Sequence, residues 1–350
     1  MNKTIESDIL IIGAGPVGLF TVFEAGLLGL KCQIVDNLDK VGGQCAELYP
    51  DKPIYDVPGI PDQTADELVQ AILAQIKPFK YGLHLGQRVE EITPIESTND
   101  IKKWVLKTSD SNEFITTNIF IAAGGGSFEP RRPPNILDPD KFLNRGVAYS
   151  VRDKKHYKNK EVVIFGGGDS ALDWTVELAD IAKSITLIHR RNQFRGAPNT
   201  ESQMRELVET GNVELKTPYV IEALEGTNSI SGVSLKHFET KETESLQCEE
   251  VLFLFGLNKK LGPIVNWGLD LKGKKISVDT ERYQTSVEGI YAVGDISDYP
   301  GKLDLILCGF HETTLAIQHA YQRCFPGKRV PFSYTTSNTK LHKILGVKVD

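Results

Sequence analysis

Two glycine clusters constrain the fold of this chain more than any other feature. Each cluster follows a short apolar run, at 8–12 and at 162–165, and each precedes a stretch with helical character. Apolar runs of this length are typical of parallel strands buried on both faces. A glycine-rich turn between such a strand and a helix indicates a βαβ unit that binds a dinucleotide. The sequence therefore predicts two such units.

The first unit has the spacing of a dinucleotide-binding turn. Gly13 permits the tight turn, Gly15 lets the backbone approach a pyrophosphate, and Gly18 lets the helix, predicted over 19–30, pack on the strand. The helix N-terminus offers free N–H groups to phosphates. The next strand ends on Asp36, which can accept hydrogen bonds from ribose hydroxyls. The predicted contacts here are Gly13, Gly15, Pro16, Val17, Gly18 and Asp36.

The second unit differs in its charge. Alanine takes the third motif position, an accepted variant, and the second strand, predicted over 185–188, ends on basic residues rather than on an acid. Arginines bind a 2′-phosphate through charge-assisted hydrogen bonds, so this site is expected to prefer NADPH to NADH. The alternative is a solvated basic strand end. The predicted contacts are Gly166, Gly168, Asp169, Ser170, Ala171, His189, Arg190, Arg191 and Arg195.

Two dinucleotide sites in one chain indicate electron transfer between two carriers that the protein positions. We expect FAD at the first site and NADPH at the second. The chain has no convincing Ser–His–Asp set, zinc-ligand spacing or paired carboxylates, so no metal and no side-chain nucleophile are predicted. His311 and Glu312, on a helix predicted over 305–324, are interpreted as helix-surface or interface residues rather than an acid–base pair.

Length, charge and hydropathy limit the classes of protein to which this chain can belong. A chain of 350 residues is long enough for two domains. A net charge of −6 argues against a general nucleic-acid binder. The run 9–12 is too short for a signal peptide, and no run approaches the roughly 20 apolar residues that span a bilayer. We therefore expect a cytoplasmic protein with no nucleic-acid or membrane partner.

The motifs together resemble the thioredoxin-reductase-like flavoproteins over nearly the whole chain. The resemblance rests on both glycine motifs, the run 189–195 and the segment 285–295, in the family's order. It implies an α/β fold with two Rossmann-like, three-layer nucleotide-binding domains, and a homodimer. The implied domains are an FAD-binding domain whose first part is 1–127, an NADPH-binding domain at 128–246, the second part of the FAD-binding domain at 247–330, and a C-terminal tail at 331–350 that covers the flavin.

The cysteines separate the branches of that family. Thioredoxin reductases carry a cysteine pair shortly before the NADPH motif, and glutathione-reductase relatives carry one after the first βαβ unit. Here the segment 146–153 has no cysteine and 42–50 has Cys45 alone. A disulfide relay needs two neighbouring sulfurs, so both disulfide mechanisms are disfavoured. The chain resembles instead the thioredoxin-reductase-type ferredoxin–NADP⁺ reductases, at 42–50, 54–59 and 261–269.

This second resemblance implies the remaining site residues and the partner. It implies a ring at Tyr49 on one face of the flavin and a tail ring, for which Tyr334 is the best candidate, on the other. NADPH would reduce the flavin, and ferredoxin or flavodoxin would receive single electrons. The lysines 154, 155, 158 and 160 are a docking patch or a solvated face. The implied FAD contacts are Asp36, Gln44, Tyr49, Val89, Phe128, Asp295 and Thr336.

Two rival functions stay open on the sequence alone. One is an NADPH-dependent disulfide reductase that works without a cysteine pair, through Cys45 or a substrate thiol. The other is a non-catalytic FAD/NADPH redox sensor. The acceptor that is reduced separates the first rival from a ferredoxin reductase, and rapid flavin reduction with turnover excludes the second.

Overall fold

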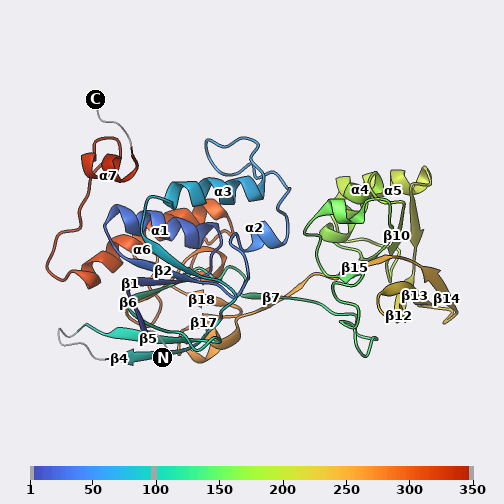
Figure 1. Ribbon diagram of the computed structural model, residues 1–350, viewed down its shortest axis with the longest axis horizontal. Helices are drawn as coiled ribbons and strands as arrows, with labels where there is room; N and C mark the ends of the chain where they lie inside the picture. The colour runs from blue at the N-terminus through green and yellow to red at the C-terminus, as the bar shows by residue number, and fades with distance from the viewer. Residues whose placement is uncertain (1–3, 96–100, 347–350) are drawn as a thin grey trace. The chain divides into compact units, whose positions relative to one another are not determined.

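The computed structural model describes residues 4–95 and 101–346, with the backbone alone at 127–129, 257–259 and 340. The chain forms two compact units (Figure 1). Unit 1 comprises Met1–Ser127 and Lys259–Asp350, and unit 2 comprises Phe128–Asn258. The two segments in which the chain passes between the units pair as a two-stranded sheet of β7 (Ser127–Pro130) and β16 (Leu257–Lys260).

Unit 1 is built on one large sheet, in the order β3-β2-β1-β6-β5-β4, with β19 also beside β6. The strands β1, β2, β3, β6 and β19 run parallel, while β4 and β5 are antiparallel to their neighbours. The carboxyl ends of these five parallel strands therefore meet at one edge. The bounds are β1 (Thr4–Ile12), β2 (Cys32–Val35), β3 (Tyr81–His84), β4 (Val89–Ile95), β5 (Lys103–Thr108), β6 (Glu113–Ile121) and β19 (Ile290–Ala292).

Helices α1 (Pro16–Leu27), α3 (Ala65–Ile76) and α6 (Ile306–Cys324) cover one face of this sheet (Figure 1). Ile9 and Ile11 of β1 point into the core beneath them, and Leu10 points into a second core on the other face, as strand alternation requires. The smaller elements of unit 1 are α2 (Gln44–Glu47), η2 (Gly262–Asn266), β17 (Leu271–Lys272), β18 (Lys275–Ser277), η3 (Gly294–Ile296), β20 (Ser297–Asp298) and α7 (Thr339–Ile344).

Helix α1 begins earlier and ends earlier than the predicted range 19–30. It begins at Pro16, because proline has a preset φ and needs no N–H partner at the first helical position. It ends at Leu27, and Gly29 then turns the chain with φ +73°. No helix within the described ranges is long and apolar enough to cross a bilayer.

Unit 2 has a wholly parallel five-stranded sheet in the order β11-β10-β9-β15-β8. Helices α4 (Asp169–Ala179) and α5 (Pro198–Glu209) pack on one face, and an antiparallel sheet, β12-β13-β14, shares the core of the other. The other elements are β8 (Val147–Ala148), η1 (Lys154–Tyr157), β9 (Glu161–Gly166), β10 (Ser184–Ile188), β11 (Val213–Lys216), β12 (Tyr219–Gly226), β13 (Ile230–His237), β14 (Thr243–Gln247) and β15 (Glu250–Leu254).

The second boundary between the units differs from the predicted one at 246/247. Strand β15 lies beyond that boundary, yet it pairs with β9 along its whole length and lies between β9 and β8 in the unit 2 sheet. The unit therefore continues to Asn258. Sequence patterns failed here because β15 is separated in the chain from the strands that it joins, so only strand pairing assigns it to unit 2.

The C-terminal segment from residue 331 contains the short helix α7. The Asn338 side chain caps this helix by accepting a hydrogen bond from the N–H of Leu341 at 3.0 Å. Leu341 is 3% exposed and belongs to the helix-covered core of unit 1. The tail is thus anchored at α7, while residues 331–337 are exposed.

Candidate functional site: two dinucleotide cradles

Packing alone demands two of the three glycines in the first turn. Gly13 has φ +112°, and a Cβ there would lie 2.4 Å from the carbonyl oxygen of Ala122 at the end of β6. A Cβ on Gly18 would lie 1.9 Å from the carbonyl oxygen of Gly13. Both positions exclude any side chain whether or not a ligand is present, so these glycines build the turn.

Gly15 is different, because nothing in the protein requires it to be glycine. Its φ is −73°, and a Cβ there would meet only the Cα of Gly43, at 3.9 Å. Gly15 is also the N-cap of α1, and no side chain caps this helix end. Open space beside uncapped N–H groups suits a pyrophosphate, which needs close backbone approach and the positive end of the helix. The first turn therefore fits the nucleotide that the sequence predicts.

Asp36 lies beside the same turn and is 9% exposed. Its Oδ2 accepts the Ala14 N–H at 2.5 Å, and its Oδ1 accepts the Leu38 N–H at 2.8 Å. Burial raises the pKa of this carboxyl group, and the two hydrogen bonds oppose that effect. A carboxylate has about four acceptor positions. The two bonds thus hold Asp36 at the turn and leave it able to accept ribose hydroxyls.

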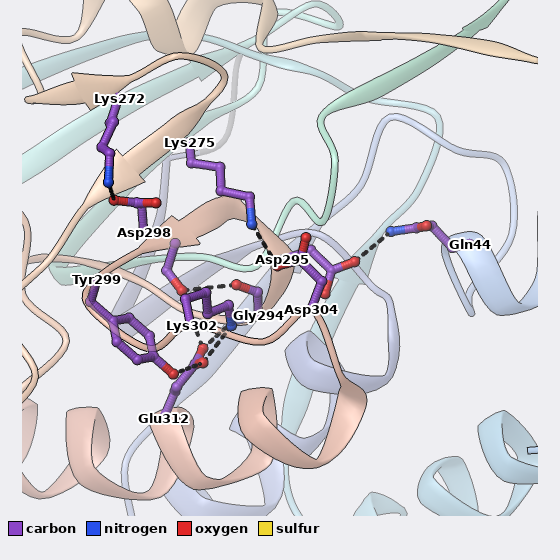
Figure 2. A network of polar contacts seen from close by, with 11 residues as sticks. Gln44, Lys272, Lys275, Gly294, Asp295, Asp298, Tyr299, Lys302, Asp304 and Glu312 are labelled. Atoms are coloured by element: carbon purple, nitrogen blue, oxygen red, sulfur yellow. Dashed lines mark hydrogen bonds and ion pairs between the residues drawn. The ribbon is translucent and has the colours of Figure 1, made fainter. Parts of the chain in front are cut away.

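The residues expected around the flavin ring come from distant parts of the chain. The Gln44 side chain, at the start of α2, donates to Asp295 Oδ2 at 3.2 Å (Figure 2). Tyr49 is half-buried, and its hydroxyl lies 3.8 Å from the Cys45 sulfur. Burial raises the pKa of Tyr49, so the phenol is neutral at physiological pH. Val89, at the start of β4, is 3% exposed.

Three predicted contacts are not brought to this group. Tyr334 is 70% exposed, and its described contacts, with Phe332 and Ser337, stay within the tail. Thr336 is exposed in the same segment. Phe128 has its backbone in β7, and its side chain lies outside the described residues. The roles of all three as flavin contacts stay predictions.

The second turn also contains one glycine that packing requires and one that has open space beside it. A Cβ on Gly166 would lie 2.5 Å from the Cβ of Ala171 and 2.6 Å from the carbonyl oxygen of Leu254, so packing requires glycine. A Cβ on Gly168 would meet nothing within 4 Å. Gly168 is the N-cap of α4, again without a side-chain cap, and the exposed Ser170 lies in the first turn. This helix end fits a second pyrophosphate.

The basic residues after β10 fold back across the second turn. The His189 ring lies so close to Gly167 that a Cβ there would be 2.3 Å from it. The Arg195 N–H donates to the Gly167 carbonyl at 2.7 Å, and Asp169 Oδ1 accepts the Ala197 N–H at 2.8 Å. These bonds tie the loop 189–197 to the start of α4. The loop that carries the arginines is thereby held next to the uncapped helix end.

The charges of this loop suit an anion. Burial lowers the pKa of His189, and the positive charges of Arg190, Arg191 and Arg195 lower it further. The three arginines are exposed, and no carboxylate in the described part of the chain forms an ion pair with them. His189 is therefore neutral at physiological pH, and the three exposed guanidinium groups are close enough to its ring to act on it electrostatically. This is the charge pattern that a 2′-phosphate requires.

One interpretation made from the sequence is wrong. Glu312 is not on the helix surface: it is 0% exposed and accepts hydrogen bonds from several buried donors. His311, its neighbour, is exposed. A signal was available, because Glu312 has the helical spacing of the small and apolar positions Gly309, Thr313 and Ala316. A carboxylate on the buried face of an amphipathic helix predicts a buried cation partner.

Fold and site together define an oxidoreductase-type protein with two dinucleotide sites. The turn 13–18 in unit 1 is called the first cradle, and the turn 166–171 in unit 2 is called the second cradle. The chain belongs to the pyridine nucleotide-disulphide oxidoreductase family, whose model matches residues 7–322. It is 49% identical to a protein of Nitrobacter winogradskyi named ferredoxin–NADP reductase, over 99% of this chain and 100% of that protein. A protein of the same name from Pelagibacter ubique is 47% identical, over 98% of this chain and 99% of that protein.

The solved structures agree with the fold. The thioredoxin reductase of T. acidophilum superposes with a TM-score of 0.70 at 21% identity, covering 91% of this chain and 99% of that one. The predicted α/β fold with two Rossmann-like units is confirmed, and so is the resemblance to thioredoxin-reductase-like ferredoxin–NADP⁺ reductases.

Proposed function

We propose that this protein carries electrons between NADPH and ferredoxin or flavodoxin by means of FAD. Unit 1 with its tail is the FAD domain and unit 2 is the NADPH domain. The observation that carries the proposal is the pair of open, uncapped helix ends at Gly15 and Gly168, one flanked by a carboxylate and the other by arginines. Bound FAD would supply the chemistry that couples a two-electron hydride donor to a one-electron acceptor.

The cysteines support this acceptor over a disulfide. Cys45 belongs to the proposed flavin site, but it is 1% exposed, and burial raises the pKa of its thiol to about 11. Cys32 is the first residue of β2, and both Cys32 and Cys324 lie beside Asp8, away from the carboxyl ends of these strands. A disulfide relay needs two accessible sulfurs at the flavin, one of them a thiolate. Cys45 is free and buried, so it does not meet that need.

The decisive experiment compares acceptors and nucleotides. NADPH oxidation is followed with ferredoxin and cytochrome, with oxidised thiols, and with NADH in place of NADPH. We expect turnover with ferredoxin, preference for NADPH, and rapid bleaching of the flavin by NADPH. Activity with disulfides alone would establish the disulfide reductase instead. Flavin reduction without turnover to any acceptor would establish the redox sensor.

We also propose that the carrier docks through a local basic patch in unit 2. Lys154 lies 3.4 Å from Glu177 and Lys160 lies 2.5 Å from Glu250, so each of these two lysines already has a carboxylate partner. Lys155 and Lys158 are exposed and have no ion pair within the described ranges. Replacing both by alanine should raise the KM for ferredoxin and flatten its salt dependence. Lys154→Ala is the matched control, and an equal effect there would count against the patch.

Assembly and compartment complete the proposal. We propose a cytoplasmic homodimer whose exposed tail, with Phe332 77% and Tyr334 70% exposed, covers a flavin. Large exposed aromatic rings are typical of contact surfaces. Light scattering coupled to gel filtration measures the assembly directly. A monomer at micromolar concentration with full activity would contradict the homodimer.

A further inference from the structure

The turn 294–296 connects three parts of the proposed flavin site. Gly294 has φ +76°, a conformation that favours glycine, and the next residue is Asp295, which contacts Gln44. A Cβ on Gly309 of α6 would lie 2.4 Å from Val17 Cγ2 and 3.2 Å from the Gly294 Cα. The turn is therefore in close contact with both α6 and the first turn of α1. A shift of Gly294 would move Asp295 relative to the cradle.

One side chain holds this turn, namely Glu312 on α6 (Figure 2). Its Oε2 accepts the Gly294 N–H at 2.6 Å. Its Oε1 accepts the Tyr299 hydroxyl at 2.8 Å and lies 2.5 Å from Lys302 Nζ. The Ser297 hydroxyl lies 3.3 Å from Oε2 and 2.9 Å from the Gly294 carbonyl oxygen. Every oxygen of the carboxylate is thus used, and both peptide groups of Gly294 are fixed.

Lys302 is the cation that compensates this buried carboxylate. The Glu312 side chain is 0% exposed and the Lys302 side chain 4% exposed, so neither charge reaches water. A buried charge without a partner is strongly unfavourable, and a buried pair holds together through short, charge-assisted hydrogen bonds. The neighbouring pairs differ, because Lys272 in the pair with Asp298 is 75% exposed. Of these neighbouring pairs, that of Glu312 and Lys302 is the one that is both buried and joined to the turn.

We propose that Glu312 is a positioning residue for the flavin: it holds the Gly294 amide, and through it Asp295, in the orientation that receives the cofactor, while Lys302 neutralises it. The inference rests on the proposed FAD site in unit 1. A buried N–H needs an acceptor in any case, and here a carboxylate on α6 supplies it in place of a neighbouring peptide carbonyl. The orientation of the Gly294 peptide therefore depends on the position of Glu312.

Two double variants separate positioning from simple stability. Lys302→Met with Glu312→Gln removes both charges but keeps one oxygen for the Gly294 N–H, and the amide NH₂ can donate to the Tyr299 hydroxyl. Lys302→Met with Glu312→Leu removes the same charges and keeps a similar volume, without an acceptor. The measured quantities are the dissociation constant of FAD, the visible absorption of the bound flavin and its reduction potential. Lys272→Met, at the exposed pair, is the control.

We expect the glutamine double variant and Lys272→Met to bind FAD with wild-type affinity and spectrum. The leucine double variant should bind FAD at least about tenfold more weakly, the factor expected for one lost hydrogen bond to a cofactor-positioning group, with a shifted flavin band and potential. Equal FAD affinities and spectra in the two double variants would overturn the inference. A wild-type protein that binds no FAD would instead overturn the proposed function.

Discussion

The basic loop beside the second cradle predicts that single arginine replacements lower the use of NADPH far more than the use of NADH. Two unit charges 4 Å apart interact by about 1 kcal/mol in bulk water and about 4 kcal/mol near a protein surface. The side chains of Arg190, Arg191 and Arg195 are exposed. Salt therefore screens their interaction with a phosphate, and the interaction energy should lie in the lower half of that range. We therefore expect about 1.4 kcal/mol, or about tenfold in kcat/KM for NADPH, for each arginine that contacts the 2′-phosphate.

The assay measures kcat/KM for both nucleotides with ferricyanide as acceptor, at low and high ionic strength. Variants Arg190→Ala, Arg191→Ala and Arg195→Ala are compared with Lys183→Ala. Lys183 precedes β10 at the amino edge of the same sheet and forms an exposed ion pair with Glu161 at 2.9 Å, a kind of contact worth little. The NADPH effect should shrink as salt rises. Equal losses with NADPH and NADH, or an equal loss in Lys183→Ala, would refute this account of the loop.

Two further predictions follow from the open glycine and the buried thiol. Gly168→Ala should lower NADPH affinity by about tenfold or more while changing the free energy of unfolding by less than about 1 kcal/mol, because its Cβ meets only the space left for phosphate. Gly166→Ala should instead lower the melting temperature. If binding and calorimetry show the reverse pattern, Gly168 is not the glycine that phosphate binding requires. Burial raises the pKa of Cys45 to about 11, so its thiol stays protonated below about pH 10. Iodoacetamide should therefore leave NADPH–ferredoxin activity intact at pH 8. Rapid inactivation that Cys45→Ala prevents would show an accessible thiolate.

Much of the nucleotide-binding core was predictable because its signals are local. Strand β10 ends at Ile188, as predicted, and α6 begins one residue after the predicted start. The unequal charges at Asp36 and at Arg190 and Arg191 also come from residues that directly follow a strand. The carboxyl ends of parallel strands meet at one edge, so residues there gather beside the glycine turns wherever the βαβ unit forms.

The rest depended on segments that are remote in the sequence. Nothing near residue 250 indicates that β15 lies between β9 and β8. The tail helix α7 is too short for a periodic signal, and its anchor, Leu341, is recognisable only by the core that it enters. The side chains of Tyr334 and Thr336 extend from that anchor into solvent, so their predicted contact with the flavin still needs a test.

The sequence by itself determined that two strand–glycine–helix turns exist and that one carries an acid and the other arginines, because turn conformation and charge belong to neighbouring residues. Only the tertiary structure distinguished glycines that packing requires, such as Gly13, from glycines left open for a ligand, such as Gly15. Only the tertiary structure showed that Glu312, interpreted from the sequence as a surface residue, is the buried acceptor of the Gly294 N–H. The reason is physical: the surroundings of a peptide group, and the burial of a charge, depend on which distant elements pack against it.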